Sequence, residues 1–291
     1  KAIEGIRWIP EWGEERIKNM VNMRSDWCIS RQRRWGVPIP MLYCEDCGKP
    51  IISDTTIKAI SDLFRAESSD AWYAKDAGEF IPADVKCECG YNKFRKETDI
   101  FDVWFDSGCT HAAVLKERPE LSWPADMYLE GCDQYRGWFQ SSLLTSVATT
   151  GQAPYKAVCT HGWVVDGNGQ QMHKSKGNQI FPEEVIKDFG ADVLRLWVAS
   201  LDYHADIRVS KDMLKQLSES YRKIRNTARY ILGNLNDNKG FDPDTEMVPF
   251  DKLRELDKWA LARLDEVIDK VKASYEAFDY YLAYHALISF C

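Results

Sequence analysis

The hydrophobic and polar positions of the chain predict helices and strands in its N-terminal part and helices alone toward its C-terminus. Residues 11–24 place apolar side chains at near-helical spacing, and residues 134–148 also fit a helix. Short apolar runs at 100–105, 127–129 and 157–165 have the length of strands. Because the helix at 134–148 lies between two of these strands, the pattern predicts a β-α-β unit in a parallel sheet.

Two less regular stretches interrupt this pattern. Residues 27–40 are rich in glycine and proline and have no clean period, which predicts a loop or an irregular strand. Residues 41–98 hold two cysteine pairs around a short helical stretch near 55–66. The sequence Asp-Ser-Gly at 106–108 predicts a turn that ends the strand before it.

Beyond Pro182 the chain is predicted to be mainly helical. The predicted helices cover residues 183–189, 191–200, 211–236 and 252–290. A polar linker at 236–249 separates the last two, and we expect a domain boundary near 205–215.

Composition places the chain among soluble globular proteins, with 45% hydrophobic and 29% charged residues in 291. No apolar run approaches the roughly 20 residues of a membrane span and no signal core is present, so we expect no membrane contact and a cytoplasmic location. The net charge of −7 argues against indiscriminate nucleic-acid binding. Residues 211–230 are locally basic, which indicates either an RNA contact or an ordinary solvated helix face.

Four of the nine cysteines form two close pairs, Cys44-x-x-Cys47 and Cys87-x-Cys89, each followed by glycine. Four thiolates suit tetrahedral zinc with no open position, so the pairs predict one structural Zn²⁺. We expect this ion to stabilise a segment with little core of its own, and the alternative is buried thiols without a metal. The other cysteines are expected to be small buried apolar residues: Cys28, Cys109, Cys132, Cys159 and Cys291.

Residues 130–139 (EGCDQYRGWF) carry candidate ligands for a nucleotide and an amino acid at the predicted carboxyl end of a strand. Gly131 allows a ligand to approach the backbone closely. Asp133 can accept hydrogen bonds from ribose hydroxyls, and Glu130 can pair with an ammonium group.

An apolar wall is predicted beside these polar groups. Gln134 and Trp138 are four residues apart and are expected to share one helical face. Trp104, at the end of the predicted neighbouring strand, could close the wall. This combination fits an aliphatic amino acid, whereas each tryptophan alone fits ordinary core packing.

Residues 161–178 (HGWVVDGNGQQMHKSKGN) predict a strand followed by a polar, glycine-containing loop with two lysines, Lys174 and Lys176. A flexible lysine loop can close over a triphosphate and neutralise charge on the leaving pyrophosphate. A plain solvated hairpin is the alternative, and His173 fits either reading.

These segments resemble the class I aminoacyl-tRNA synthetases, and within that family the isoleucyl branch, over nearly the whole chain. The cysteine pairs match the zinc-bearing connective insertion of the family. The other motifs that carry the resemblance are DWCISRQRRWGVPIP (26–40), DVWFDSG (102–108), EGCDQYRGWFQSSL (130–143) and HGWVVDG…MHKSKGN (161–178).

The resemblance implies an α/β fold: the second half of a Rossmann-like catalytic domain with a zinc-binding insertion, followed by the start of an α-helical anticodon-binding bundle. The implied segments are a connective segment at 1–40, the zinc insertion at 41–98, the catalytic half-domain at 99–182, a helical stem-contact region at 183–210 and a truncated anticodon-binding bundle at 211–291.

The resemblance also implies an activity: a monomeric ligase activates isoleucine with Mg²⁺-ATP and transfers it to tRNA-Ile. The implied adenylate contacts are Glu130, Gly131, Asp133 and Gln134, with Trp104 and Trp138 around the isoleucine side chain and His161 and Gly162 near the adenosine.

Residues 171–175 match the KMSKS loop of the family, with Lys174 as its second lysine, which implies that Lys174 acts on the phosphates. Gln171 and His173 stand where the family has its first lysine and first serine, while Met172 and Ser175 match. Phosphate stabilisation is therefore expected to rest more heavily on Lys174, with Lys176 as a possible substitute.

None of the five histidines lies in a His-x-Gly-His arrangement, and no threonine-rich editing segment is present. In the family both features precede the matching region, so we expect an internal fragment that is inactive alone. Two alternatives stay open: a non-catalytic zinc-and-helix module that binds RNA or a protein, and an enzyme of the same class that charges valine or leucine.

Overall fold

The protein is described here by a computed structural model of residues 1–235 and 240–291, in which the chain forms two compact units. The first unit comprises Lys1–Tyr128 and Asp133–Val158, and the second comprises Leu129–Cys132 and Cys159–Cys291. The limits of the units fall within strands β7 (Tyr128–Gly131) and β8 (Ala157–His161). The predicted segment limits at 182/183 and 210/211 lie inside the second unit.

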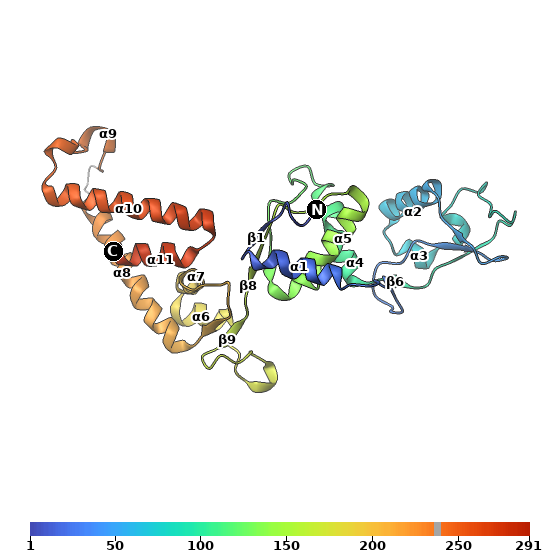
Figure 1. Ribbon diagram of the computed structural model, residues 1–291, viewed down its shortest axis with the longest axis horizontal. Coiled ribbons are helices and arrows are strands. Elements are labelled where there is room, and N and C mark those ends of the chain that lie inside the picture. The colour runs from blue at the N-terminus through green and yellow to red at the C-terminus, as the bar shows by residue number, and fades with distance from the viewer. Residues whose placement is uncertain (236–239) are drawn as a thin grey trace. The chain divides into compact units, whose positions relative to one another are not determined.

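The first unit contains helices and short strands, several of which are labelled in Figure 1. They are β1 (Arg7–Ile9), α1 (Trp12–Asn22), β2 (Ser30–Arg31), β3 (Leu42–Cys44), β4 (Pro50–Ile51), α2 (Asp54–Glu67), α3 (Ala71–Ala74), β5 (Phe94–Lys96), β6 (Ile100–Phe101), α4 (Val103–Gly108) and α5 (Trp138–Thr150).

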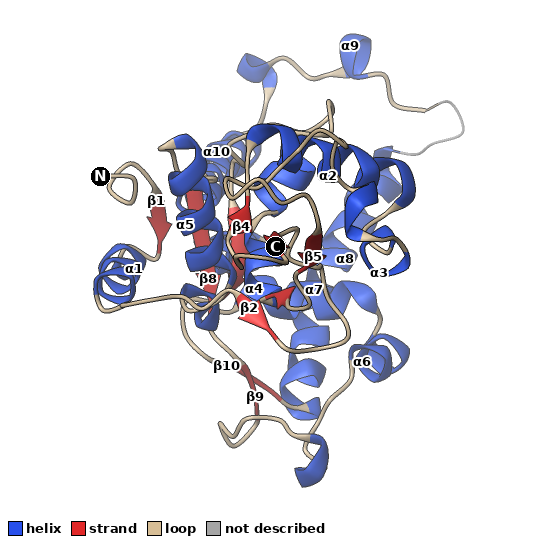
Figure 2. Cartoon of the chain, turned by 90° about the vertical axis from the view of Figure 1, so that its right-hand side faces the viewer, coloured by secondary structure: helices blue, strands red, loops and turns tan. Residues whose placement is uncertain are grey.

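The predicted β-α-β unit is present, because α5 connects β7 to β8 and these strands are neighbours in a sheet of order β1-β8-β7. An isolated bridge between Ala125 and Tyr155, just before the two strands, is parallel. The Tyr155 hydroxyl donates to the carbonyl of Phe139 on α5 at 3.0 Å, and Figure 2 shows α5 next to β8. Buried aromatic side chains therefore fix α5 to the strands.

The prediction of a strand at 100–105 is wrong beyond Phe101, because Asp102 is the N-cap of helix α4. Its carboxylate accepts a hydrogen bond from Trp104 N at 3.1 Å, which is the contact of a helix N-cap. Asp102 is buried, and its other oxygen accepts from Arg31 at 2.7 Å and from the indole of Trp27 at 2.9 Å. The turn predicted at 106–108 consequently lies inside α4.

Residues 41–98, the predicted insertion, have a substantial core, whereas the sequence predicted little core for this segment. Trp72 and Phe80 are almost fully buried, and their ring centroids lie 4.8 Å apart. The helix predicted near 55–66 is confirmed as α2, which Ser53 and Thr56 begin with a capping box. The same core contains two of the paired cysteines, Cys44 and Cys87.

The second unit is mainly helical, as predicted. Within its described residues no helix is long and apolar enough to cross a membrane, and the same holds for the first unit. Its elements are β9 (Val164–Asp166), α6 (Pro182–Phe189), α7 (Ala191–Ser200), β10 (Ile207–Val209), α8 (Lys211–Leu235), α9 (Pro243–Glu246), α10 (Glu255–Ala277) and α11 (Tyr280–Phe290).

Two predicted elements of the second unit are divided. The strand at 157–165 ends at His161, and β9 pairs in parallel with β10 in a separate sheet. The helix at 252–290 is broken at Phe278, whose left-handed backbone (φ 64°) ends α10. The predicted linker at 236–249 begins on residues 236–239, which lie outside the described residues, as does the last residue of the helix predicted at 211–236.

Candidate functional site

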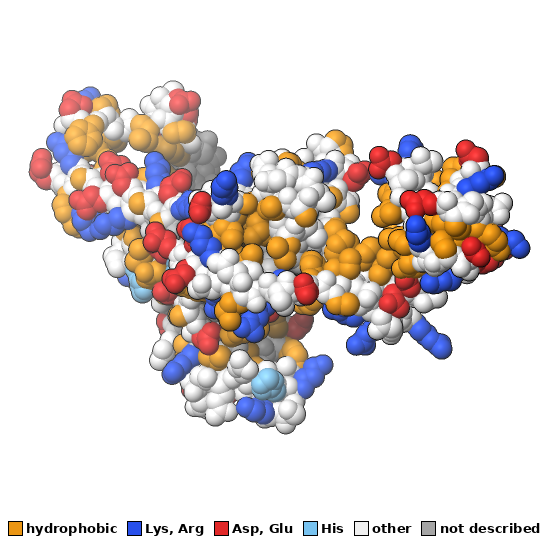
Figure 3. Space-filling model, turned by 45° about the vertical axis from the view of Figure 1, so that its right-hand side comes forward, with side chains coloured by type: hydrophobic (Ala, Val, Ile, Leu, Met, Phe, Trp, Pro, Cys, Tyr) orange, Lys and Arg blue, Asp and Glu red, His pale blue; other side chains and the backbone are white. Residues whose placement is uncertain are grey.

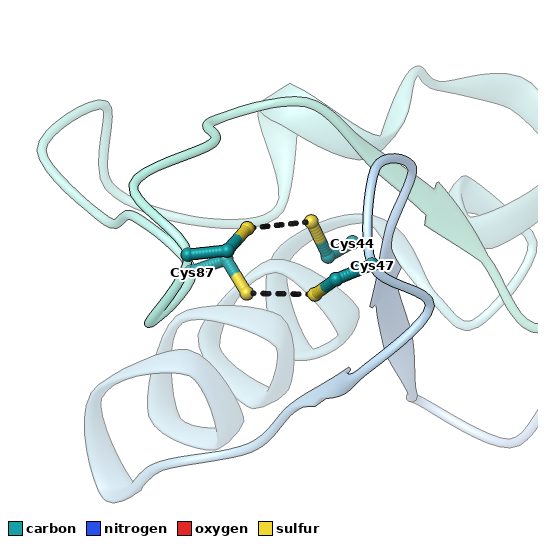
Figure 4. A group of neighbouring side chains, drawn as sticks. Cys44, Cys47 and Cys87 are labelled. Carbon is teal, nitrogen blue, oxygen red and sulfur yellow. Dashed lines mark hydrogen bonds between the residues drawn. The ribbon is translucent and has the colours of Figure 1, made fainter.

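The four paired cysteines meet in one cluster, as their spacing predicted. Their sulfur atoms all lie within 4.8 Å of one another, with Cys44 Sγ 3.7 Å from Cys89 Sγ and Cys47 Sγ 3.4 Å from Cys87 Sγ (Figure 4). Four sulfurs bound at about 2.3 Å to one tetrahedral zinc lie about 3.8 Å apart. The donor set and its spacing therefore fit a single zinc ion.

Both cysteine turns depend on the glycine that follows them. Gly48 and Gly90 have φ values of 71° and 90°, in the left-handed region that glycine adopts without strain. Gly48 N donates to the carbonyl of Cys44 at 3.0 Å, and Gly90 N donates to that of Cys87 at 2.8 Å. These turns bring each pair of sulfurs to the same side of the backbone.

The thiols influence one another's ionisation. The backbone amide of Cys47 lowers the pKa of Cys44 to about 7. A hydrogen bond from the Tyr91 amide lowers the pKa of Cys89, but desolvation and the neighbouring thiols outweigh it and raise that pKa to about 12. Without a cation the four groups do not all ionise at neutral pH, whereas a bound divalent cation favours the thiolate form of each.

Trp104, Gln134 and Trp138 lie close together in the first unit, but not in the way the sequence predicted. Trp104 belongs to α4 rather than to the end of a strand, and Gln134 lies in a 3₁₀ turn (Cys132–Tyr135) before α5. Gln134 and Trp138 therefore share no helical face. Instead, Gln134 Oε1 accepts a hydrogen bond from Trp138 N at 2.9 Å and caps the start of α5.

Gly137 keeps this group compact, and the sequence reasoning missed it. A Cβ atom at Gly137 would lie 2.6 Å from Gln134 Oε1 and 3.0 Å from the Trp104 ring. The signal available in the sequence was that Gly137 directly precedes Trp138 within the helix predicted at 134–148. Close approach of side chains to a backbone is a common reason for glycine at such a position.

Trp138 is held rigidly from its other side. Its indole Nε1 donates to the carbonyl of Ser107 at 2.9 Å and contacts Thr110 Oγ1 at 3.2 Å. Its ring stacks on Tyr128 with the centroids 4.0 Å apart. Trp104 is 43% exposed, so this wall has one fixed and one accessible tryptophan.

The predicted polar contacts lie at the ends of β7 and β8. Gly131 is buried at the end of β7, and the preceding Glu130 is exposed. Asp133 is exposed and accepts from Gln134 Nε2 at 3.4 Å. His161 ends β8 with an exposed side chain, and its Nδ1 lies 2.8 Å from the carbonyl of Gly162.

Gly162 has a structural reason for being glycine. Its N donates to the carbonyl of Tyr203 at 2.9 Å, and a Cβ there would lie 2.4 Å from the carbonyl of Ala205. Segment 203–206 thus passes directly against the end of β8. Any side chain at Gly162 would push this segment away.

Asp166 and Asn178 form the frame of the lysine loop. Asp166 accepts from Asn178 Nδ2 at 2.8 Å, and Asn178 Oδ1 accepts from His173 N at 3.0 Å. The hydrogen bond from Asn178 lowers the pKa of Asp166, so this carboxylate is charged at neutral pH. No role was predicted from the sequence for either residue, although Asp166 and Asn178 stand at the two ends of the loop.

The loop presents its cations to solvent. Lys174 and Lys176 lie in a 3₁₀ turn (Lys174–Lys176) that Gly177 ends in a left-handed conformation, and Gln171, His173 and Ser175 are exposed as well. Met172 instead packs against the core around Trp197. Figure 3 shows basic (blue) and histidine (pale blue) side chains together on this exposed loop.

The chain matches curated relatives along its whole length. The chain is 61% identical to isoleucine–tRNA ligase of Caldanaerobacter subterraneus subsp. tengcongensis and 59% identical to that of Caldicellulosiruptor bescii. Each alignment covers 100% of this chain and 31% of the relative. The chain therefore spans about a third of the length of these relatives.

Two solved structures share the fold. A ternary complex of Agrobacterium radiobacter LeuRS with tRNA and LeuAMS superimposes with a TM-score of 0.66 at 23% identity, over 91% of this chain and 35% of that one. Mycobacterium tuberculosis methionyl-tRNA synthetase in complex with methionyl-adenylate gives 0.60 at 17% identity, over 98% and 47%.

The family comparison covers the greater part of the chain. The family model described as "tRNA synthetases class I (I, L, M and V)" matches residues 1–210 of the 291. This range includes the four cysteines, the Trp104 and Trp138 wall and the lysine loop. The chain belongs to the class I tRNA synthetases of the isoleucine, leucine, methionine and valine group.

Proposed function

We propose that the protein carrying this chain is an isoleucine–tRNA ligase, which activates isoleucine with Mg²⁺-ATP and transfers it to tRNA-Ile. The observation that carries the proposal is the 61% identity to a protein of that name along the whole chain. The arrangement of Trp104, Gln134 and Trp138 supports it, because two indole rings and a single amide form a surface suited to a small aliphatic side chain.

The proposed reaction is an in-line attack of the isoleucine carboxylate on the α-phosphate of ATP, which forms the adenylate and releases pyrophosphate. Glu130 is proposed to pair with the isoleucine ammonium group and Asp133 to accept from the ribose hydroxyls. Both carboxylates are exposed and available to a ligand. Gly131 and Gly162 are proposed to leave room for the adenylate backbone and adenosine, with His161 beside them.

Lys174 is proposed to neutralise the charge that develops on the phosphates, with Lys176 in a lesser role. An exposed lysine on a loop with a rigid frame can reach a ligand without first leaving an internal ion pair. The hydrogen bonds of Asp166 and Asn178 already restrict the conformations of the loop, so less conformational entropy is lost when the loop binds a ligand.

We propose a structural Zn²⁺ at Cys44, Cys47, Cys87 and Cys89. The ion supplies no chemistry to the reaction, because four thiolates leave no coordination position open. Its role is to join the two cysteine turns of the insertion.

We propose that the segment limits follow the family, with a catalytic half-domain at 99–182, a stem-contact region at 183–210 and tRNA-binding helices from 211 onward. All six basic residues of 211–230 are exposed on α8, which gives this helix a surface for phosphate groups. This surface also favours the second candidate function, a non-catalytic module that binds RNA through the helices.

The test of the proposed function is isoleucine-dependent exchange of pyrophosphate into ATP by the full-length protein. We expect exchange with isoleucine at lower concentrations than with valine or leucine, and charging of tRNA-Ile. Stronger exchange with valine or leucine assigns the protein to another branch. If tRNA binds without any exchange, the non-catalytic module is favoured.

Replacement of Gly137 by alanine is expected to raise the KM for isoleucine in that exchange reaction. The added methyl group must displace the Gln134 amide or the Trp104 ring, both of which it would otherwise overlap. The KM for ATP should change less. Gly78→Ala provides a control, since nothing lies within 4 Å of its Cβ position and its backbone is not left-handed. An unchanged KM for isoleucine in Gly137→Ala would contradict the proposed wall.

A further inference from the structure

Segment 202–206 joins α7 to β10 and is fixed against the end of β8. The carbonyl of Tyr203 accepts from Gly162 N at 2.9 Å, and Asp206 Oδ1 accepts from Trp163 N at 2.8 Å. The backbone of Ala205 lies so close to Gly162 that a Cβ there would overlap it at 2.4 Å. The segment therefore cannot shift at this point without moving the residues that follow β8.

The same segment contacts the corner between α10 and α11. The Tyr203 hydroxyl donates to the carbonyl of Phe278 at 2.8 Å. His204 Nδ1 lies 2.9 Å from the Asp202 carboxylate and 4.0 Å from that of Asp279. Phe278 has the left-handed conformation that reverses the chain, so both contacts are made where the two helices meet.

The Tyr203 hydroxyl lies between β8 itself and the corner. Tyr203 Oη lies 3.4 Å from Cys159 Sγ, in the middle of β8, and 2.8 Å from the carbonyl of Phe278. Desolvation, together with the contact to Cys159, raises the pKa of Tyr203 above its usual range, so the hydroxyl keeps its proton. It is thus available as a hydrogen-bond donor to the corner throughout the pH range in which the protein works.

We propose that Tyr203 is a positioning residue that sets the corner between α10 and α11 relative to the end of β8. This inference rests on the proposed tRNA charging function, in which the helices hold tRNA and the end of β8 lies near the nucleotide. Adenylate formation needs no tRNA and does not depend on this joint. Binding of tRNA in a productive position does depend on it.

Tyr203→Phe in the full-length protein tests the inference, because it removes one oxygen atom and keeps the ring. We expect the KM for tRNA in aminoacylation to rise about three- to tenfold, the size expected for the loss of one neutral hydrogen bond. The KM values for isoleucine and ATP in pyrophosphate exchange should stay within about twofold. His204→Ala, which removes the neighbouring contact to the corner, should raise the same KM for tRNA.

Tyr43→Phe is the matched control, since Tyr43 is also partly buried and its hydroxyl donates to Glu97 at 2.9 Å in the insertion. It should leave the KM for tRNA unchanged. The inference is overturned if Tyr203→Phe leaves that KM unchanged. It is also overturned if both reactions fall by the same factor with a lower melting temperature, because that result indicates a purely structural role. An unaltered protein that charges no tRNA contradicts the proposed function and this inference together.

Discussion

Lys174→Ala in the full-length protein is expected to slow isoleucyl-adenylate formation by about 10²- to 10³-fold, while isoleucine binding persists. The loss of one group aimed at charge that develops in the transition state has that size in other enzymes. We propose that this role rests mainly on Lys174, because Gln171 and His173 stand where the motif has its first lysine and first serine. The measurement is single-turnover formation of the adenylate, with isoleucine binding followed by calorimetry.

Lys176→Ala is the comparison that makes the first prediction specific. Lys174 and Lys176 are both exposed in one 3₁₀ turn, which has about three residues per turn. Side chains two positions apart in such a turn are about 120° apart around its axis, so we expect the two lysines to face different parts of a bound ligand. We therefore expect a much smaller effect at Lys176. Equal losses in the two variants would contradict the role given to Lys174, as would an unchanged rate in Lys174→Ala.

The cysteine cluster was predictable because its geometry is local. The two short spacings and the following glycines dictate the turns at Gly48 and Gly90, and those turns orient each pair of thiols. That the two pairs meet, across about 40 residues of sequence, followed from the chemistry of a four-ligand ion. The core around Trp72 was not foreseen, because its residues are dispersed without a helical or strand period.

The wall around Trp138 was predicted in composition but not in geometry. In the sequence, Asp102 fits either a strand, as a polar position among apolar ones, or the N-cap of a helix. Its contacts with Arg31 and Trp27, which fix the helix cap, are visible only in the folded structure. Gln134 was assigned to α5 because a single glycine such as Gly137 is tolerated inside a helical pattern and did not mark the later start of α5. In both cases tertiary contacts determined the backbone, and the side chains of Trp104 and Gln134 are therefore placed differently from the prediction.

The joint at Tyr203 depends entirely on tertiary structure. Its partners are Cys159 and Phe278, which are 44 and 75 residues away in sequence. Gly162 appeared in the sequence only as part of a motif resemblance. Its physical reason, the close passage of segment 203–206, required the three-dimensional structure.

Loss of the metal is the second prediction with a large expected effect. We expect one zinc per chain in the purified protein, measured by elemental analysis, and its loss in Cys47→Ser and Cys89→Ser. Each substitution removes a thiolate from the four-sulfur cluster, which lowers zinc affinity by orders of magnitude. Cys28→Ser is the matched control. Contrary to the burial expected for the scattered cysteines, Cys28 is exposed, and because it lies outside the cluster its loss should leave the zinc content at one.

The response of the insertion to zinc removal should be local. In small peptides, binding of a structural zinc ion contributes about 10–16 kcal/mol to the free energy of folding, and the peptides do not fold without the ion. Here Trp72, Phe80 and Ile60 form a core next to the cysteines, so the insertion is expected to keep α2 when a chelator removes the metal. Hydrogen exchange should therefore accelerate by more than about 100-fold at 44–49 and 87–91, where the turns are held by the ion, and much less within α2. An equal acceleration of exchange throughout the insertion would show that the ion maintains the whole segment. Unchanged exchange at the cysteine turns would show that the ion stabilises neither the turns nor the rest of the segment.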